Sequence, residues 1–124
     1  MTMRDSIAAA RISGPQSEGD GAAVFEFRFA ADDATFQGHF PSRPLVPGVF
    51  QLEMARAAAE WMLNCPLAIR EVGKAKFLRP IRPDEIVRLT MKLSPNDHTI
   101  QARAGFSVEG QPAGESWLSL WRTE

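Results

Sequence analysis

FQGHFPSRPLVPGVFQLE, residues 36–53, is the stretch from which both the fold and the function of this chain are best read. Three prolines stiffen its first half, because each fixes its own φ and biases the residue before it away from the helical region. These are Pro41, Pro44 and Pro47. We therefore expect an extended chain over residues 40–47 and a helix that begins at Gly48.

The same stretch carries a candidate base and a candidate acid at a fixed spacing. His39 is one of only 2 histidines in the chain, and Glu53 is the only acid in the first turns of the expected helix. A loop joined to a helix at this spacing allows the two side chains to converge on one ligand. Taken alone, however, a histidine in a glycine–proline loop is more often a hydrogen-bonding turn residue than a catalyst.

The expected helix start has no side chain that caps it. Its candidate cap positions hold Val46, Pro47, Gly48 and Val49, none of which is a Ser, Thr, Asp or Asn. The first N–H groups, at the positive end of the helix dipole, are then free to bind an anion, a polarised carbonyl oxygen or water. Gly48 lets a ligand approach the backbone closely.

This segment resembles the signature of the 3-hydroxyacyl-acyl-carrier-protein dehydratases, the FabZ/FabA-like proteins, which reads roughly G-H-F-P-x-x-P-x-x-P-G-V-x-x-x-E. Every fixed position of that signature is matched. The matching residues are Gly38, His39, Phe40, Pro41, Pro44, Pro47, Gly48, Val49 and Glu53. A second likeness covers residues 74–85, KAKFLRPIRPDE, beside the family's K-F-R-R-P-V-x-P-G-D, with Asp84 in place of the family glycine.

The resemblance implies the α+β hot-dog fold, in which a curled antiparallel sheet wraps around one long central helix. In that family two sheets pair edge to edge in a dimer, which places the loop histidine of one subunit near the helix acid of the other. The implied partner is acyl carrier protein with a phosphopantetheine-linked acyl substrate. The homodimer is the expected assembly, and pairing with a homologue is an alternative.

Dehydration of a 3-hydroxyacyl thioester needs a base, an oxyanion donor and an acid. By the resemblance, His39 removes the α-proton, and its ordinary pKa of about 6.5 suits that task. The Gly48 N–H hydrogen-bonds the thioester carbonyl, where charge develops. Glu53 protonates the departing hydroxyl, which requires an apolar pocket that keeps it protonated. The expected substrate-binding residues are Phe40, Pro47, Val49 and Phe50.

Several other functions compete with this interpretation. Glu53 can instead pair with Arg56 on a solvated helix face that Glu60 extends. The prolines can be read as an exposed ligand for an aromatic groove. A hot-dog thioesterase also places an acid on the long helix but lacks the H-F-P loop, so His39 argues against it. A non-catalytic acyl-binding partner of a dehydratase would be expected to lose the acid or the base, and this chain has both.

Composition limits the remaining possibilities. With 124 residues, 44% hydrophobic residues, 23% charged residues and a net charge of −1, we expect a single domain over residues 1–124 and no nucleic-acid partner. A single cysteine, Cys65, cannot form an internal disulfide, which favours the cytoplasm. We expect no membrane span, metal or cofactor, since neither histidine has a second ligand at a recognisable spacing.

Periodicity and turn residues predict the order of the elements. Residues 6–13 are open between a strand and the end of a short helix, and residues 14–21 are expected to form a turn. Alternating phenylalanines predict a half-buried strand over 24–29, and helical spacing predicts a helix over 48–63. Four further strands are expected at 68–79, 85–93, 98–108 and 114–122.

The N-terminal residues and a set of basic residues bear on the pathway and on the partner of this chain. Residues 1–23 do not match the family's usual N-terminal segment, which favours a pathway-specific relative such as the dehydratases of aryl-polyene or other polyketide-like lipids. A set of basic residues is either a landing surface for acyl carrier protein or an ordinary solvated strand face. These residues are Lys74, Lys76, Arg79, Arg82 and Arg88.

Overall fold

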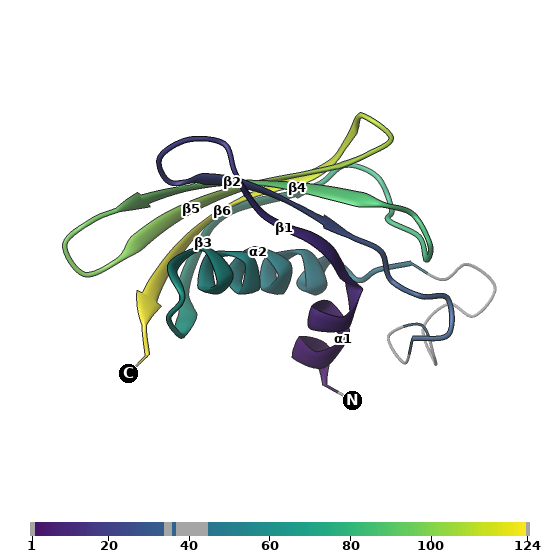
Figure 1. Ribbon diagram of the computed structural model, residues 1–124, viewed down its shortest axis with the longest axis horizontal. Coiled ribbons are helices and arrows are strands. Elements are labelled where there is room, and N and C mark those ends of the chain that lie inside the picture. Colours follow the sequence, from purple (N-terminus) through teal and green to yellow (C-terminus); the bar gives the residue numbers. More distant parts are fainter. Residues whose placement is uncertain (1, 34–35, 37–44, 124) are drawn as a thin grey trace.

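The structure is a computed structural model, which describes residues 2–33, 36 and 45–123. Helices and strands follow one another along these residues as Figure 1 shows. They are α1 (Met3–Ala10), β1 (Arg11–Ser17), β2 (Ala22–Phe27), α2 (Gly48–Leu63), β3 (Leu67–Phe77), β4 (Val87–Pro95), β5 (Ile100–Val108) and β6 (Gln111–Arg122). Among the helices described, none is both long and apolar enough to cross a membrane.

The strands form one 6-stranded antiparallel sheet in the order β1-β2-β4-β5-β6-β3, so β1 and β3 are its edges. The long helix α2 lies along one face of the curved sheet, and the short helix α1 sits beside its N-terminal half (Figure 1). This arrangement confirms the predicted α+β class, a curled antiparallel sheet around one long helix.

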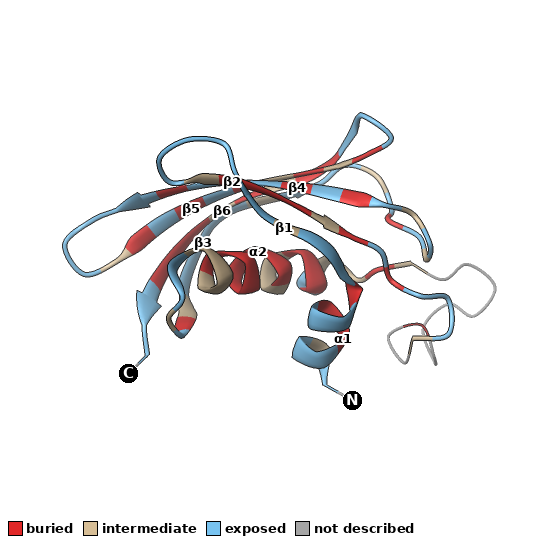
Figure 2. Ribbon diagram, in the orientation of Figure 1, coloured by how far each residue is buried: buried red, intermediate tan, exposed pale blue. Residues whose placement is uncertain are grey.

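Helix α2 begins at Gly48 and ends at Leu63, as the sequence predicts. Pro47 is its N-cap, with φ −60° and ψ 148°, and no side chain caps the first turn. At the other end Asn64 has a φ of 55° and donates its N–H to the Glu60 carbonyl, which closes the last turn. Most of α2 is buried or half-buried, whereas α1 is largely exposed (Figure 2).

The core lies between α2 and the concave face of the sheet. In β4 the residues alternate strictly between buried and exposed, and Val87, Leu89 and Met91 point inward with no exposed surface. From β2, Phe25 and Phe27 pack against Trp61 of α2, with ring centroids 5.9 and 6.2 Å away. Aromatic burial at these positions fixes α2 against the sheet.

The sequence leaves residues 6–13 open between a strand and the end of a short helix. The structure shows both, one after the other. Helix α1 ends at Ala10 and β1 begins at Arg11. A capping box starts α1, because the Thr2 hydroxyl accepts the Asp5 N–H at 3.1 Å and the Asp5 carboxylate accepts the Thr2 N–H at 3.0 Å. The Thr2 N–H bond is the main reason that the pKa of Asp5 lies below its ordinary value.

The prediction of a turn over residues 14–21 is wrong for its first half. Strand β1 continues through Gly14 and Pro15 to Ser17, with an irregular register between Ser13 and Gln16. Gly14 has a φ of 105°, and a Cβ at this position would lie 2.6 Å from the Val24 carbonyl oxygen. The two residues therefore mark an irregularity in an edge strand, and not its end.

The four later strands are confirmed, although their ends shift by a few residues. The largest shift is in β6, which begins at Gln111 and not at residue 114. Glu109 and Gly110, with φ of 52° and 77°, complete the turn between β5 and β6 on their own, so Val108 already pairs with Gln111. Positive φ at both central residues is the geometry of a tight two-residue hairpin.

Truncating Met54 tests how much the helix–sheet contact stabilises the fold. Met54 is fully buried, and Met54→Ala is expected to lower the free energy of unfolding by about 2–5 kcal/mol. The control Leu63→Ala removes an apolar side chain from the same helix at 38% exposure and should cost much less. Denaturant unfolding measures both; equal losses would contradict this placement of the core.

Candidate functional site

The first turn of α2 borders a hollow of about 330 Å³. The loop before the helix is held in place by the Val46 N–H, which donates to the Ile81 carbonyl oxygen at 2.7 Å. The walls of the hollow are mostly apolar, and its lining includes Leu45, Val46, Gly48, Gln51, Phe77 and Ile81. The two stretches that resemble the dehydratase family, around residues 48 and 77, therefore meet at one site.

Space is tight around Gly48. A Cβ added to it would lie 3.1 Å from the ring of Phe77, which is tighter than ordinary van der Waals contact. No side chain caps the helix here, and the Phe50 N–H is already bonded to the Pro47 carbonyl at 2.9 Å. The arrangement leaves the backbone of the first turn accessible beside an apolar hollow, as an oxyanion donor requires.

Asp84 stands where the family pattern of residues 74–85 has glycine, and its backbone conformation explains why the replacement fits. Its φ is 67°, a left-handed conformation that glycine adopts freely and that aspartate tolerates better than most residues. Its N–H donates to the Phe29 carbonyl at 2.8 Å, just beyond the ends of β2 and β4, where Phe27 pairs with Val87. The substitution of the family glycine thus preserves the backbone turn.

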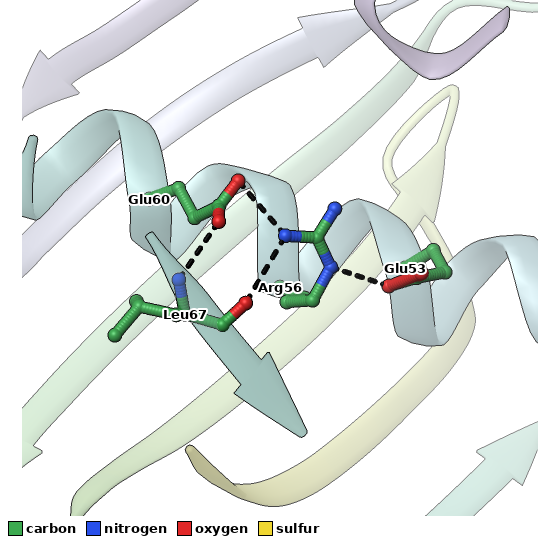
Figure 3. A network of polar contacts seen from close by, with 4 residues as sticks. All are labelled: Glu53, Arg56, Glu60 and Leu67. Atoms are coloured by element: carbon green, nitrogen blue, oxygen red, sulfur yellow. Dashed lines mark hydrogen bonds and ion pairs between the residues drawn. The ribbon is translucent and has the colours of Figure 1, made fainter. Parts of the chain in front are cut away.

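A buried ion network anchors the opposite side of α2 (Figure 3). The Arg56 guanidinium donates to the Glu53 carboxylate at 2.6 Å and contacts the Glu60 carboxylate at 2.8 Å. Arg56 also donates to the Leu67 carbonyl at 3.3 Å, and Glu60 accepts the Leu67 N–H at 2.8 Å. Burial lowers the pKa of Arg56, but its hydrogen bonds to Glu53 and Glu60 outweigh burial and raise the pKa.

This network confirms the pairing of Glu53 with Arg56 and Glu60 but corrects the picture of a solvated face. Arg56 is only 3% exposed, so the network is part of the helix–sheet contact. The predicted acid role of Glu53 requires an apolar pocket. The structure differs from this prediction, because the Arg56 guanidinium contacts the Glu53 carboxylate. The role of Glu53 as a proton donor stays a prediction, and it requires this contact to open.

Glu53 lines a second hollow of about 310 Å³. Residues from α1, α2 and the start of β3 surround this second hollow, among them Met3, Val49, Leu52 and Ile69. It shares no lining residue with the hollow at Gly48. Within one chain, therefore, the predicted oxyanion donor and the predicted acid lie on different sides of the helix.

The remaining predicted site residues have different placements. His39 and Phe40 lie outside the described residues. Val49 is 52% exposed beside Glu53, and Pro47 is the N-cap of α2. Phe50 packs edge to face against Phe29, with ring centroids 6.0 Å apart, and is a core residue in the single chain.

The structure adds two residues that the sequence reasoning did not assign. Arg56 is one, and the signal for it was the i, i+3, i+7 spacing of Glu53, Arg56 and Glu60. Gln51 is the other: it is 3% exposed, lines the hollow at Gly48, and its amide oxygen has no hydrogen-bond partner in the described structure. A polar residue amid the apolar first turns of α2 was the available signal.

The basic residues of the second stretch are mostly paired. Lys76 contacts Glu115 at 3.7 Å, Arg79 contacts Glu85 at 2.7 Å, and Lys74 lies 5.3 Å from the ring centroid of Trp117. A landing surface for acyl carrier protein is not tested by these contacts. Over the residues described, no group of three or more His, Cys, Asp or Glu side chains is placed to hold a metal ion.

The antiparallel sheet around one long helix defines the class of hot-dog proteins. The chain belongs to the ApeI-like family: the model of that family, described as ApeI dehydratase, matches residues 15–114. The predicted dehydratase identity, a hydro-lyase of the FabZ-like kind, is thereby confirmed.

Two curated relatives agree with this assignment. The 3-hydroxyacyl-[acyl-carrier-protein] dehydratase FabZ of Chloroflexus aggregans is 36% identical over 106 residues, which cover 77% of this chain and 72% of the relative. The FabZ of Natranaerobius thermophilus is 38% identical over 72 residues, and the chain spans about half of that relative, 51%.

A solved structure supports the fold. The chain resembles the dehydratase heterocomplex ApeI:P from Xenorhabdus doucetiae with a TM-score of 0.76. The match covers 90% of this chain and 96% of that one, at 23% sequence identity.

Removing Glu60 tests the network as an anchor of α2. Glu60→Ala leaves the Leu67 N–H and one side of the buried guanidinium unpaired, and should lower the free energy of unfolding by about 1–3 kcal/mol. The control Glu71→Ala breaks a pair at 4.0 Å between exposed side chains and should be nearly neutral. Comparable losses for both variants in denaturant unfolding would show that the network contributes no more than a surface ion pair.

Proposed function

We propose that this protein catalyses the reversible dehydration of (3R)-3-hydroxyacyl thioesters on acyl carrier protein to trans-2-enoyl thioesters. The reaction would serve fatty-acid or polyketide-like lipid synthesis. The observation that carries the proposal is Gly48, which stands at the uncapped start of α2 beside an apolar hollow. Membership of the ApeI-like dehydratase family supports it. The predicted cytoplasmic location stays a prediction.

The proposed reaction assigns one step to each candidate residue. The Gly48 N–H binds the thioester oxygen and stabilises the enolate-like charge that develops there. The His39 imidazole takes the α-proton. The electron pair of the broken C–H bond then forms the second bond between C2 and C3. The 3-hydroxyl leaves as water with a proton from Glu53. Proton transfer from the histidinium to the carboxylate then restores the starting states, and the reverse sequence hydrates the enoyl thioester.

The acid step requires Glu53 to separate from Arg56. The network allows this, because Arg56 keeps its contact with Glu60 at 2.8 Å and with the Leu67 carbonyl at 3.3 Å when Glu53 turns away. Glu53 is also the more exposed end of its pair, with a side chain 21% exposed against 4% for Arg56. The guanidinium is therefore not left as an unpaired buried charge.

The proposed active unit is a dimer, expected to be a homodimer, with a homologue as the alternative partner. In one chain Gly48 and Glu53 line separate hollows, so the described site is incomplete without a second copy. Among the residues that the structure describes, the edge strand β3 pairs with β6 alone, and it exposes Val72 at 43% and Phe77 at 54%. An open edge with exposed apolar residues is suited to pairing with another strand.

Substitution of the two proton-transfer residues tests the mechanism. His39→Ala and Glu53→Gln are each expected to lower kcat for enoyl hydration by about a hundred- to ten-thousandfold, because each removes a general acid or base. Glu18→Gln, at an exposed position between β1 and β2, is the matched control. Circular dichroism checks folding, and near-normal turnover in either folded variant would contradict the assigned roles.

Mixing the two inactive variants tests whether a site combines residues of two subunits. Random exchange of His39→Ala and Glu53→Gln subunits should restore about a quarter of wild-type activity, because half of the dimers are mixed and each holds one intact site of two. A mixture of His39→Ala with the double variant is the control and should stay inactive. Failure to recover activity, despite proven subunit exchange, would place both residues in one chain's site.

A further inference from the structure

Two buried polar groups without partners lie between α2 and β6. The amide oxygen of Gln51 and the hydroxyl of Ser116 are inaccessible to solvent, and neither has a hydrogen-bond partner in the described structure. Their residues are 3% and 2% exposed. Buried polar atoms are nearly always hydrogen-bonded, and an unsatisfied one destabilises the fold, so each such group calls for an explanation.

The backbone around Gln51 is shaped to hold its amide. A Cβ on Gly114 would overlap the Gln51 amide oxygen and approach the Lys76 carbonyl to 3.0 Å. Glycine at this point of β6 thus makes room for the amide between β6 and β3. Ser116 follows two residues later on the same strand, and both residues are buried, so both face α2.

Gln51 also shares a helix face with the proposed oxyanion donor. It stands three residues after Gly48, a spacing that places two residues on the same side of a helix, and both line the 330 Å³ hollow. A thioester whose carbonyl binds the Gly48 N–H would place one of its two arms, acyl or pantetheine, beside Gln51. We take this arm to be the acyl group. The other walls are mostly apolar and include Val46, Phe77 and Ile81. The one charged side chain in the described lining, Arg79, is paired with Glu85 at 2.7 Å.

We propose that Gln51, assisted by Ser116, is a polar subsite that selects acyl groups carrying a hydroxyl or carbonyl beyond the reacting carbons over purely saturated chains. A hydroxyl on the acyl chain can donate to the Gln51 amide oxygen, and a hydroxyl or a carbonyl can accept from Ser116. A saturated chain leaves both groups unpaired, as they are in the described chain, and gains neither hydrogen bond. This inference rests on the proposed function, because it takes the acyl thioester as the ligand of this hollow.

The test compares two thioesters of equal length that share one pantetheine arm. One 3-hydroxyacyl chain is saturated beyond C3, and the other carries one further hydroxyl or keto group. Wild type should prefer the oxygenated substrate in kcat/KM, and Gln51→Met should reduce that preference about ten- to hundredfold. Ser116→Ala should shift the preference in the same direction by less.

The variants are chosen so that folding does not confuse the result. Methionine has nearly the length of glutamine and replaces an unsatisfied amide by apolar atoms, so Gln51→Met should be as stable as wild type or more stable. Leu78→Met is the control, because it alters the apolar lining of the same hollow without removing a polar group. It should leave the preference unchanged.

The outcomes separate this inference from the proposed function. An unchanged preference in Gln51→Met, or an equal fall on both substrates, overturns the acyl subsite; the equal fall would point to the pantetheine arm as the ligand of Gln51. If wild type turns over neither substrate, the dehydratase proposal fails. In that case calorimetry can still test Gln51 with unreactive thioether analogues of both chains. Wild type should bind the oxygenated analogue more tightly than the saturated one, and Gln51→Met should lose this difference in affinity.

Discussion

The contact between α2 and the concave face of the sheet is the constraint on which the rest of the structure depends. Ala55, Ala58 and Ala59 are completely buried, so the helix backbone lies close to the strands. Phe25 and Phe27 close one side of the contact against Trp61. Because interiors are close-packed, a small displacement of α2 would disturb every side chain that it places, including those of the candidate site.

Two sides of the same helix have distinct tasks. One carries the alanines and Met54 into the core and, at its N-terminal end, presents Gly48 and Gln51 to the apolar hollow. The other holds the charged network around Arg56. A single rigid element thus positions Gly48 and Glu53 for different steps of the proposed reaction. The helix fixes these two groups, whereas the proposed base, His39, belongs to the segment that precedes it.

Stability and function overlap at Arg56. The guanidinium joins Glu53 to Glu60 and to the start of β3, so the residue that anchors the helix also contacts the proposed acid. Buried ion pairs gain little net stability over apolar packing, although removal of one partner is costly. A network with two acids around one cation lets one acid move while the cation remains paired.

Much of the fold was predictable because its local signals agree. Pro47 and Gly48 mark the helix start, Asn64 marks its end, and alternating burial in β4 follows its sequence pattern. The misassigned segment, Gly14-Pro15, reads as a turn locally, but pairing of β1 with β2 keeps it in the strand. Local composition cannot reveal a pairing that tertiary contacts impose.

The site was predictable to a lesser degree. The motif identified Gly48 and Glu53, but sequence spacing does not show that they line separate hollows. Nor does it show that Arg56 is buried, since the same i, i+3 spacing occurs on solvated helices. The unpaired amide of Gln51 depends on the absence of a side chain at Gly114, which is far away in the sequence. Such features arise only when distant elements pack.

The most direct test of the central claim is enoyl-thioester hydration by the unmodified protein. Trans-2-enoyl groups of several chain lengths, on acyl carrier protein and on pantetheine, should lose their conjugated absorbance, and the product made in deuterated water should carry one solvent deuterium at its α-carbon. A folded, dimeric protein that leaves every substrate unchanged would contradict the account and favour a non-catalytic partner of an active dehydratase.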